Sequence, residues 1–259
     1  MSRSRKEDAV RQYYRALYRV WGPQHWWPAE TQFEVIVGAY LTQNTAWTNV
    51  ELAMGNLRKA RVLSIEGIRK VSQPRLERLI RPSGYFRQKA TRLKTFVRFL
   101  DKNYGGSLDR LFSQPTDQLR ESLLSLNGVG PETADSILLY AGNHPVFVVD
   151  AYTRRIIDRH GILPEKTDYE EIRQLFQRAL EPIVDQQEIT PAKTPLESGL
   201  QGAAHPPSAM STATRTALVQ VYNEMHGLIV GVGKNYCRKS KPVCEECPLQ
   251  GFLPEGRRT

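Results

Sequence analysis

Hydrophobic side chains recur at helical spacing along most of the chain. In EDAVRQYYRALYRVW (residues 7–21), Val10, Tyr14, Leu17 and Trp21 fall three or four positions apart and share one helix face. The same period runs through QFEVIVGAYL, AWTNVELAMGNLRKA, RQKATRLKTFVRFLDKNY, PTDQLRESLLSL, ETADSILLYAG, DAYTRRIIDRHG and YEEIRQLFQRAL, with glycine or proline near their ends. Only VFVVD (146–150) looks like a strand, and it is too short to build a sheet. The pattern predicts an all-α fold.

One segment, from Asp185 to about Thr214, interrupts this rhythm. It contains four prolines and no Phe, Tyr or Trp, and it is rich in Ala, Ser, Thr and Gln. Such a composition buries too little apolar surface to offset the entropy of ordering. We therefore predict a flexible insertion over 185–214, with a recognition arm as the alternative.

Charge narrows the class of partner. The 259 residues carry a net charge of +9 with a pI near 9.5, which suits a polyanion or indicates only a solvated basic surface. The start, MSRSRKEDAV, has no apolar core for a secretory signal, and no apolar run reaches membrane-spanning length. The three clustered cysteines argue against a disulfide framework. We expect a cytoplasmic monomer with no membrane contact, nucleoid-associated if bacterial.

The stretch LNGVGPETAD (126–135) joins two of the predicted helices. Gly128 and Gly130 allow positive backbone dihedrals, and Pro131 suits the first position of a helix. Such a turn leaves backbone N–H groups unpaired at the positive end of a helix. We predict a DNA-phosphate site there, formed by Gly128, Val129, Gly130 and Thr133; an ordinary tight turn is the alternative.

Eighteen residues after Glu132 stands Asp150, in VFVVDAYTRRI. A helix–hairpin–helix, a loop containing Gly and Pro, and V-D-x-x-x-x-R together resemble the endonuclease III superfamily of DNA glycosylases, over nearly the whole chain outside 185–214. The resemblance implies two helical lobes, 32–143 and 1–31 with 144–259, and an active-site cleft between them. It also implies that Asp150 drives cleavage of the base–sugar bond, a role compatible with capping a helix.

Glu132 bears on the reaction type. Bifunctional members of that superfamily carry at this hairpin position a lysine whose amine attacks the sugar and forms a Schiff base. A carboxylate cannot do this. The resemblance therefore implies a monofunctional glycosylase that uses water, with Glu132 in a catalytic or structural role. The alternatives are a glycosylase/AP lyase for oxidised pyrimidines or mismatches, and a DNA-binding helix-hairpin-helix module without catalysis.

Near the N-terminus, WWP followed by LTQNT and an aromatic residue resembles the superfamily's 3-methyladenine DNA glycosylase branch. The resemblance implies a wedge, Gln43 and Asn44, that fills the gap left by an extruded base. It further implies a base pocket formed by Trp26, Trp27, Pro28 and Trp47. We add Lys234 to this pocket, because it follows a helix near the C-terminus. An aromatic slot attracts a cationic base by about 0.5–2 kcal/mol per contact. Ordinary core packing is the alternative for the tryptophans.

The cysteines raise the question of a metal. Cys237, Cys244 and Cys247 match three positions of the C-x6-C-x2-C-x5-C pattern with which many superfamily members hold a [4Fe–4S] cluster. The fourth position is Leu253, which cannot ligate iron. Three alternatives follow for this segment: an iron–sulfur cluster with another fourth ligand, a zinc site, or a site without metal. We favour the site without metal. The chemistry itself requires no cofactor, and the expected partner is duplex DNA that contains damaged bases.

Overall fold

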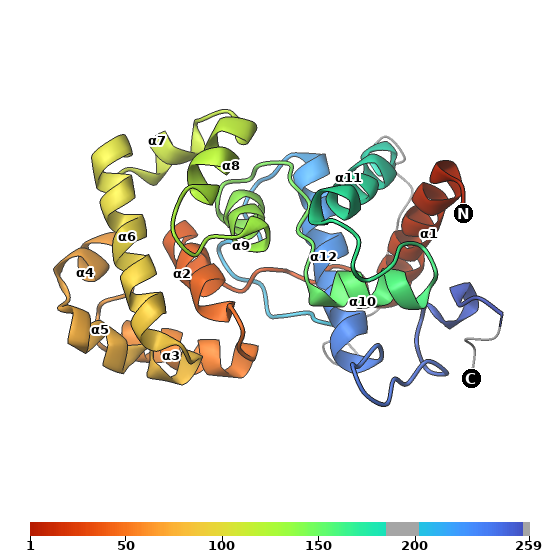
Figure 1. Ribbon diagram of the computed structural model, residues 1–259, viewed down its shortest axis with the longest axis horizontal. Coiled ribbons are helices and arrows are strands. Elements are labelled where there is room, and N and C mark those ends of the chain that lie inside the picture. Colours follow the sequence, from red (N-terminus) through yellow and green to blue (C-terminus); the bar gives the residue numbers. More distant parts are fainter. Residues whose placement is uncertain (185–201, 256–259) are drawn as a thin grey trace. The chain divides into compact units, whose positions relative to one another are not determined.

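The computed structural model describes residues 1–184 and 202–255 of the chain (Figure 1). Within these ranges it contains helices and loops but no strand, which confirms the predicted all-α class. None of the helices described is long and apolar enough to cross a membrane. The chain divides into two compact units: a central unit, Ala29–His144, and a terminal unit, Met1–Pro28 with Pro145–Thr259.

The central unit is built around α2 (Gln32–Thr42). Thr31 caps this helix by accepting a hydrogen bond from the Glu34 N–H at 3.1 Å. Every residue from Phe33 to Leu41 is buried, and α2 packs against α3, α6 and α9 (Figure 1). The other elements are α3 (Trp47–Lys59), α4 (Ile65–Lys70), α5 (Gln73–Leu79), the 3-10 turn η1 (Arg81–Ser83), α6 (Phe86–Tyr104), α7 (Leu108–Phe112), α8 (Thr116–Leu124), α9 (Pro131–Ser136) and the π-helical turn η2 (Ile137–Ala141).

The terminal unit is built around α12 (Ala217–Asn235), which packs against α1, α10 and α11. A Cβ at Gly233 would lie 2.1 Å from the ring of Tyr152, so this glycine lets α10 approach closely. Because α12 is apolar on most sides, it suits a helix enclosed by neighbours. The elements of this unit are α1 (Arg3–Trp21), α10 (Ala151–Arg159), α11 (Tyr169–Leu180), the 3-10 turn η3 (Glu181–Ile183), α12 and the 3-10 turn η4 (Gln250–Phe252).

The flexible insertion over 185–214 stays a prediction, and the structure describes contacts for its second part. Residues 202–214 pack onto the loop after α1: the Ala203 N–H donates to Gln24 Oε1 at 2.8 Å, and the His205 N–H donates to the Gln24 carbonyl at 3.1 Å. Met210 and Ser211 are buried as well. These hydrogen bonds and the burial of Met210 and Ser211 attach the segment to the terminal unit, although it contains no Phe, Tyr or Trp. Residues 185–201 lie outside the described residues.

A buried carboxyl group lies where that loop meets α12. Glu224 Oε2 accepts a hydrogen bond from the Gln24 N–H at 2.7 Å, and its Oε1 accepts one from Gln220 Nε2 at 2.8 Å. Burial raises the pKa of Glu224 to about 7, because the low-dielectric interior penalises the charged form. The group is therefore close to half-ionised at neutral pH.

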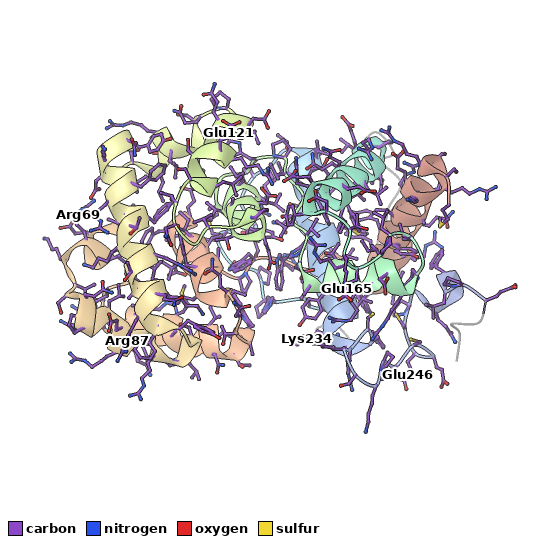
Figure 2. All side chains as sticks on the ribbon, in the orientation of Figure 1. Arg69, Arg87, Glu121, Glu165, Lys234 and Glu246 are labelled. Atoms are coloured by element: carbon purple, nitrogen blue, oxygen red, sulfur yellow. The ribbon has the colours of Figure 1, made fainter. Side chains whose placement is uncertain are left out.

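We expect Glu224→Gln to stabilise the protein at pH 8 and to change little at pH 5. The folded-state pKa lies above the usual 4.5, so the stability contributed by the neutral acid is complete below pH 4.5 and is lost as pH rises through 7. At pH 8 the wild type has therefore lost roughly 3 kcal/mol of its free energy of unfolding through ionisation of Glu224. Urea unfolding at both pH values measures it. Glu165→Gln, at an exposed site (Figure 2), is the control, and an equal change in both variants would contradict the prediction.

Candidate functional site

A tight turn joins α8 and α9. Gly128 has a φ of +80°, and the Val129 N–H closes the turn on the Leu126 carbonyl at 3.0 Å. The positive φ favours glycine here, and because a Cβ would lie 1.9 Å from Arg92 Nε, a larger residue would also displace the Arg92 side chain. Pro131 occupies the first turn of α9, as predicted from the sequence.

An ion pair locks the two helices of this hairpin together. Arg120 Nε donates to Asp135 Oδ1 at 2.6 Å, and its second nitrogen donates to Oδ2 at 3.1 Å. The Asp135 side chain is fully buried, and that of Arg120 is 14% exposed. A bidentate pair fixes the orientation of both partners. The carboxylate of Asp135 therefore helps to fix the angle between α8 and α9.

Gln43, the residue after α2, connects the end of that helix to the hairpin. Its Nε2 donates to the Gly128 carbonyl at 3.0 Å and to Thr133 Oγ1 at 2.9 Å. An Arg92 nitrogen donates to Gln43 Oε1 at 2.6 Å. The amide of Gln43 thus engages the turn on one side and a guanidinium from α6 on the other. We call this arrangement of Gln43, Arg92, Gly128 and Thr133 the hairpin bracket.

Asn44 lies at the exposed corner beyond the bracket. It is solvent-exposed and has a left-handed φ of 52°, which asparagine tolerates better than most residues. The buried Lys89 holds the preceding helix end, donating to the Leu41 carbonyl at 2.8 Å and to the Ser83 carbonyl at 2.6 Å. Burial, with the nearby Arg92 charge, lowers the pKa of Lys89 to about 8. The wedge stays a prediction, and of its two residues Asn44 is the exposed one.

Asp150 stands at the start of α10, in the terminal unit. The segment VFVVD is a buried extended loop, and the Tyr169 hydroxyl accepts a hydrogen bond from the Val149 N–H at 3.2 Å. Asp150 Oδ1 accepts from the Thr153 N–H at 2.7 Å and from Thr153 Oγ1 at 2.8 Å, a capping box. The cap fixes one carboxylate oxygen of Asp150.

His226, from α12, faces the other oxygen. Its Nε2 lies 3.5 Å from Asp150 Oδ2, and both side chains are largely buried. Burial opposes ionisation of Asp150, but the interactions with His226 and then with Thr153 outweigh it, so the pKa lies below its ordinary value. The carboxylate is therefore charged at neutral pH. Sequence reasoning missed His226 because no spacing pattern links it to Asp150.

The predicted pocket residues fall in both units. Trp26 and Trp27 are buried in the terminal unit, with their rings 5.7 Å apart in a T-shaped arrangement; the following Pro28 is half-buried. Trp47, half-buried, begins α3 in the central unit. Glu132 is exposed in the first turn of α9. A pocket that combines these tryptophans stays a prediction.

Lys234 lines a cavity of about 640 Å³ in the terminal unit. The residue is exposed near the end of α12, and Glu246 lines the same cavity; both residues are labelled in Figure 2. His205 also lines it, and the His205 ring lies 5.5 Å from that of Trp26. The tryptophans of the WWP stretch are not among the lining residues. The assignment of Lys234 to the base pocket stays a prediction.

The cysteine segment does not fit an iron–sulfur cluster. Cys237 is buried, and its Sγ accepts a hydrogen bond from an Arg159 nitrogen at 3.2 Å. The fourth position is the buried, apolar Leu253. Over residues 1–184 and 202–255, no three His, Cys, Asp or Glu side chains are grouped so that they could hold a metal ion. With three thiols and no fourth ligand, the segment lacks the four-cysteine set of such clusters.

Comparisons with known proteins agree with this architecture. Residues 37–182 match the family described as HhH-GPD superfamily base excision DNA repair protein. A Methanocaldococcus jannaschii protein named as a candidate DNA repair glycosylase is 40% identical over 95% of this chain and 96% of its own length. Endonuclease III of Thermotoga maritima is 27% identical over 87% of this chain and 84% of its own length.

Among solved structures, that of an H. pylori 3-methyladenine DNA glycosylase bound to 1,N6-ethenoadenine resembles this chain. Its TM-score is 0.67, with 27% identity over 90% of this chain and 98% of its own. The family match spans the hairpin bracket and Asp150. The chain belongs to the HhH-GPD superfamily of base excision DNA repair proteins, and is a DNA glycosylase of that superfamily.

Proposed function

We propose that this glycosylase hydrolyses the N-glycosidic bond of alkylated bases, foremost 3-methyladenine, after flipping the base out of duplex DNA. The observation that carries the proposal is the carboxylate of Asp150, which is capped on one oxygen and kept ionised by its surroundings. A fixed negative charge stabilises the sugar cation that develops when the bond to the base breaks.

The substrate class follows from the rest of the chemistry. A base methylated at N3 carries a positive charge in the nucleotide, so it leaves without being protonated first. One carboxylate then suffices, because it stabilises the sugar cation and orients the attacking water. The tryptophans offer an electron-rich face to a cationic ring, worth about 0.5–2 kcal/mol per contact. The likeness to the H. pylori 3-methyladenine enzyme supports this choice.

We also propose that the enzyme does not cleave the DNA backbone. Glu132 stands where a lyase of the superfamily has its amine, and a carboxylate cannot form a Schiff base. Lys89 has a lowered pKa, but its amine is buried and donates to two carbonyl oxygens, which disfavours it as a nucleophile. The proposed chemistry uses water and Asp150 and needs no cofactor.

The test uses DNA methylated with dimethyl sulfate and duplexes with one defined lesion. We expect chromatography to detect released 3-methyladenine, and strand breaks to appear only after alkali. Borohydride should trap no protein–DNA adduct. Release of oxidised pyrimidines with a trapped adduct would replace the proposal by the glycosylase/lyase alternative. Release of no base at all, with duplex binding retained, would favour the non-catalytic module.

The hairpin bracket supports a second part of the proposal, the DNA contacts. Backbone N–H groups at the start of α9 have no partner within their helix, and an anion such as a DNA phosphate satisfies them. Arg92 brings a guanidinium to the same turn, fixed by Gln43 and packed on Gly128. We propose that Arg92 adds a charge to the phosphate site, and that Asn44 enters the base stack while Gln43 holds the turn.

Arg92→Gln is expected to weaken binding of damaged and undamaged duplex equally. Each lost phosphate contact lowers the slope of log K against log salt by about 1. Fluorescence anisotropy over a range of salt concentrations measures that slope. Arg98→Gln, an exposed arginine on the same helix, is the matched control. A loss confined to the lesion duplex would instead assign Arg92 to base recognition.

A further inference from the structure

We propose that His226 is a positioning residue that holds the carboxylate of Asp150 in its reactive orientation through a hydrogen bond to Oδ2. The inference rests on the proposed role of Asp150. His226 touches neither the base nor the sugar in this proposal. It acts through the aspartate, from a helix that lies far away in the sequence.

The carboxylate is held from two sides. Thr153 gives Oδ1 two hydrogen bonds, at 2.7 and 2.8 Å, and His226 Nε2 lies 3.5 Å from Oδ2. A carboxylate can only accept hydrogen bonds, so the proposed hydrogen bond requires the proton to be on Nε2. The capping box engages only Oδ1, and the imidazole is the group that faces Oδ2.

The imidazole itself is held by aromatic rings. The His226 ring centroid lies 6.3 Å from that of Trp26, at 65°, and 6.4 Å from that of Phe147, at 82°. Both arrangements are T-shaped, which is a favoured geometry for aromatic pairs. His226 is therefore clamped between a predicted base-pocket residue and the loop that leads to Asp150.

Other charged groups nearby are engaged elsewhere. On α10, Arg154 donates to the Thr167 carbonyl at 2.6 Å, and Arg155 donates to the Cys237 carbonyl at 2.6 Å. On α12, Glu224 bonds the Gln24 N–H. The interaction with His226, ahead of that with Thr153, lowers the pKa of Asp150 against the effect of burial. Loss of the imidazole therefore makes the carboxylate harder to ionise.

Two substitutions separate the hydrogen bond from the packing. His226→Phe keeps a ring between Trp26 and Phe147 but removes the donor, whereas His226→Gln keeps a donor and removes the ring. We expect His226→Phe to slow single-turnover excision roughly ten- to hundredfold and to move the acid limb of its pH profile up by about one unit. His226→Gln should lie closer to wild type, and neither variant should change the Kd for lesion DNA.

His160→Phe is the matched control. His160 is another buried histidine of the terminal unit, hydrogen-bonded to the Tyr13 hydroxyl at 2.8 Å. Its loss should lower the thermal midpoint while the acid limb stays in place. The inference would be overturned if the acid limb of the pH profile did not move in His226→Phe. It would also be overturned if His226→Gln lost more excision rate than His226→Phe.

A double variant separates this inference from the proposed function. In an Asp150→Asn background, His226→Phe should cause no further loss of rate. If Asp150→Asn retains full activity, the proposed function fails first. A measurement on the wild type needs no variant to fold: ¹⁵N-detected imidazole spectra near neutral pH should show a proton on His226 Nε2, and a proton on Nδ1 alone would refute the hydrogen bond.

Discussion

Asp150→Asn is expected to fold, to bind lesion DNA and to release the damaged base about 10²-fold more slowly, or slower still. Asparagine keeps the shape of the side chain and caps a helix about as well as aspartate, so the hydrogen bonds from Thr153 survive. The negative charge is lost. In the proposed reaction that charge stabilises the sugar cation only as the glycosidic bond breaks, so we expect the loss to fall on the rate and not on binding.

Single-turnover release of 3-methyladenine measures the effect, together with anisotropy for binding and thermal unfolding for stability. Asp168→Asn is the matched control, since Asp168 caps α11 in the same unit by accepting from the Glu170 N–H at 2.8 Å. Both variants should retain their caps, and only the variant at 150 should lose activity. Near-wild-type release by Asp150→Asn would remove this residue from the chemistry.

Asp135→Asn should lower the free energy of unfolding by about 3–5 kcal/mol, because it removes the charge of one partner from a buried, bidentate ion pair. The carboxylate of Asp135 is fully buried, and Arg120 contacts both of its oxygens. The hairpin would lose the contact that fixes α8 against α9. DNA binding should therefore weaken along with stability.

Asp101→Asn provides the comparison for this effect. Arg69 also contacts both oxygens of Asp101, but each side chain of that pair is more than a third exposed. An exposed pair contributes about 0–1 kcal/mol. Urea unfolding of both variants should show a difference of at least about 2 kcal/mol. Equal losses would mean that burial does not decide the strength of the Arg120–Asp135 pair.

The periodic pattern predicted most of the helices but not every one. It located α11 from YEEIRQLFQRAL because one face of that helix is apolar and the other is charged. It did not single out α12, because residues 217–235 are apolar on most sides and contain several glycines, so no stripe stands out. The contacts of the segment 202–214 with Gln24 were also not predicted, since composition does not register such hydrogen bonds.

For the candidate site, the sequence predicted the residues that belong to recognisable motifs. It did not predict the residues that contact those motifs from other parts of the chain. Asp150 and the glycine turn could be identified from local spacing and a family resemblance. Arg92 and His226 could not, because each meets its partner across a long separation: 49 positions from Arg92 to Gln43, and 76 from Asp150 to His226. Such contacts depend on tertiary packing, which no local pattern encodes.

The hairpin bracket has a consequence for how damage is located along a strand. Gln43 is hydrogen-bonded to the turn at Gly128 and Thr133 and directly precedes Asn44. These hydrogen bonds therefore fix the distance between Asn44 and the turn within the central unit. If the turn grips a phosphate, the spacing between that grip and the intruding asparagine is set by protein geometry and not by the sequence being scanned. One residue inserted between Gln43 and Asn44 would change that distance, so that it no longer matched the spacing of nucleotides along the strand. Lesion recognition would then fail, while binding to the DNA phosphates would remain.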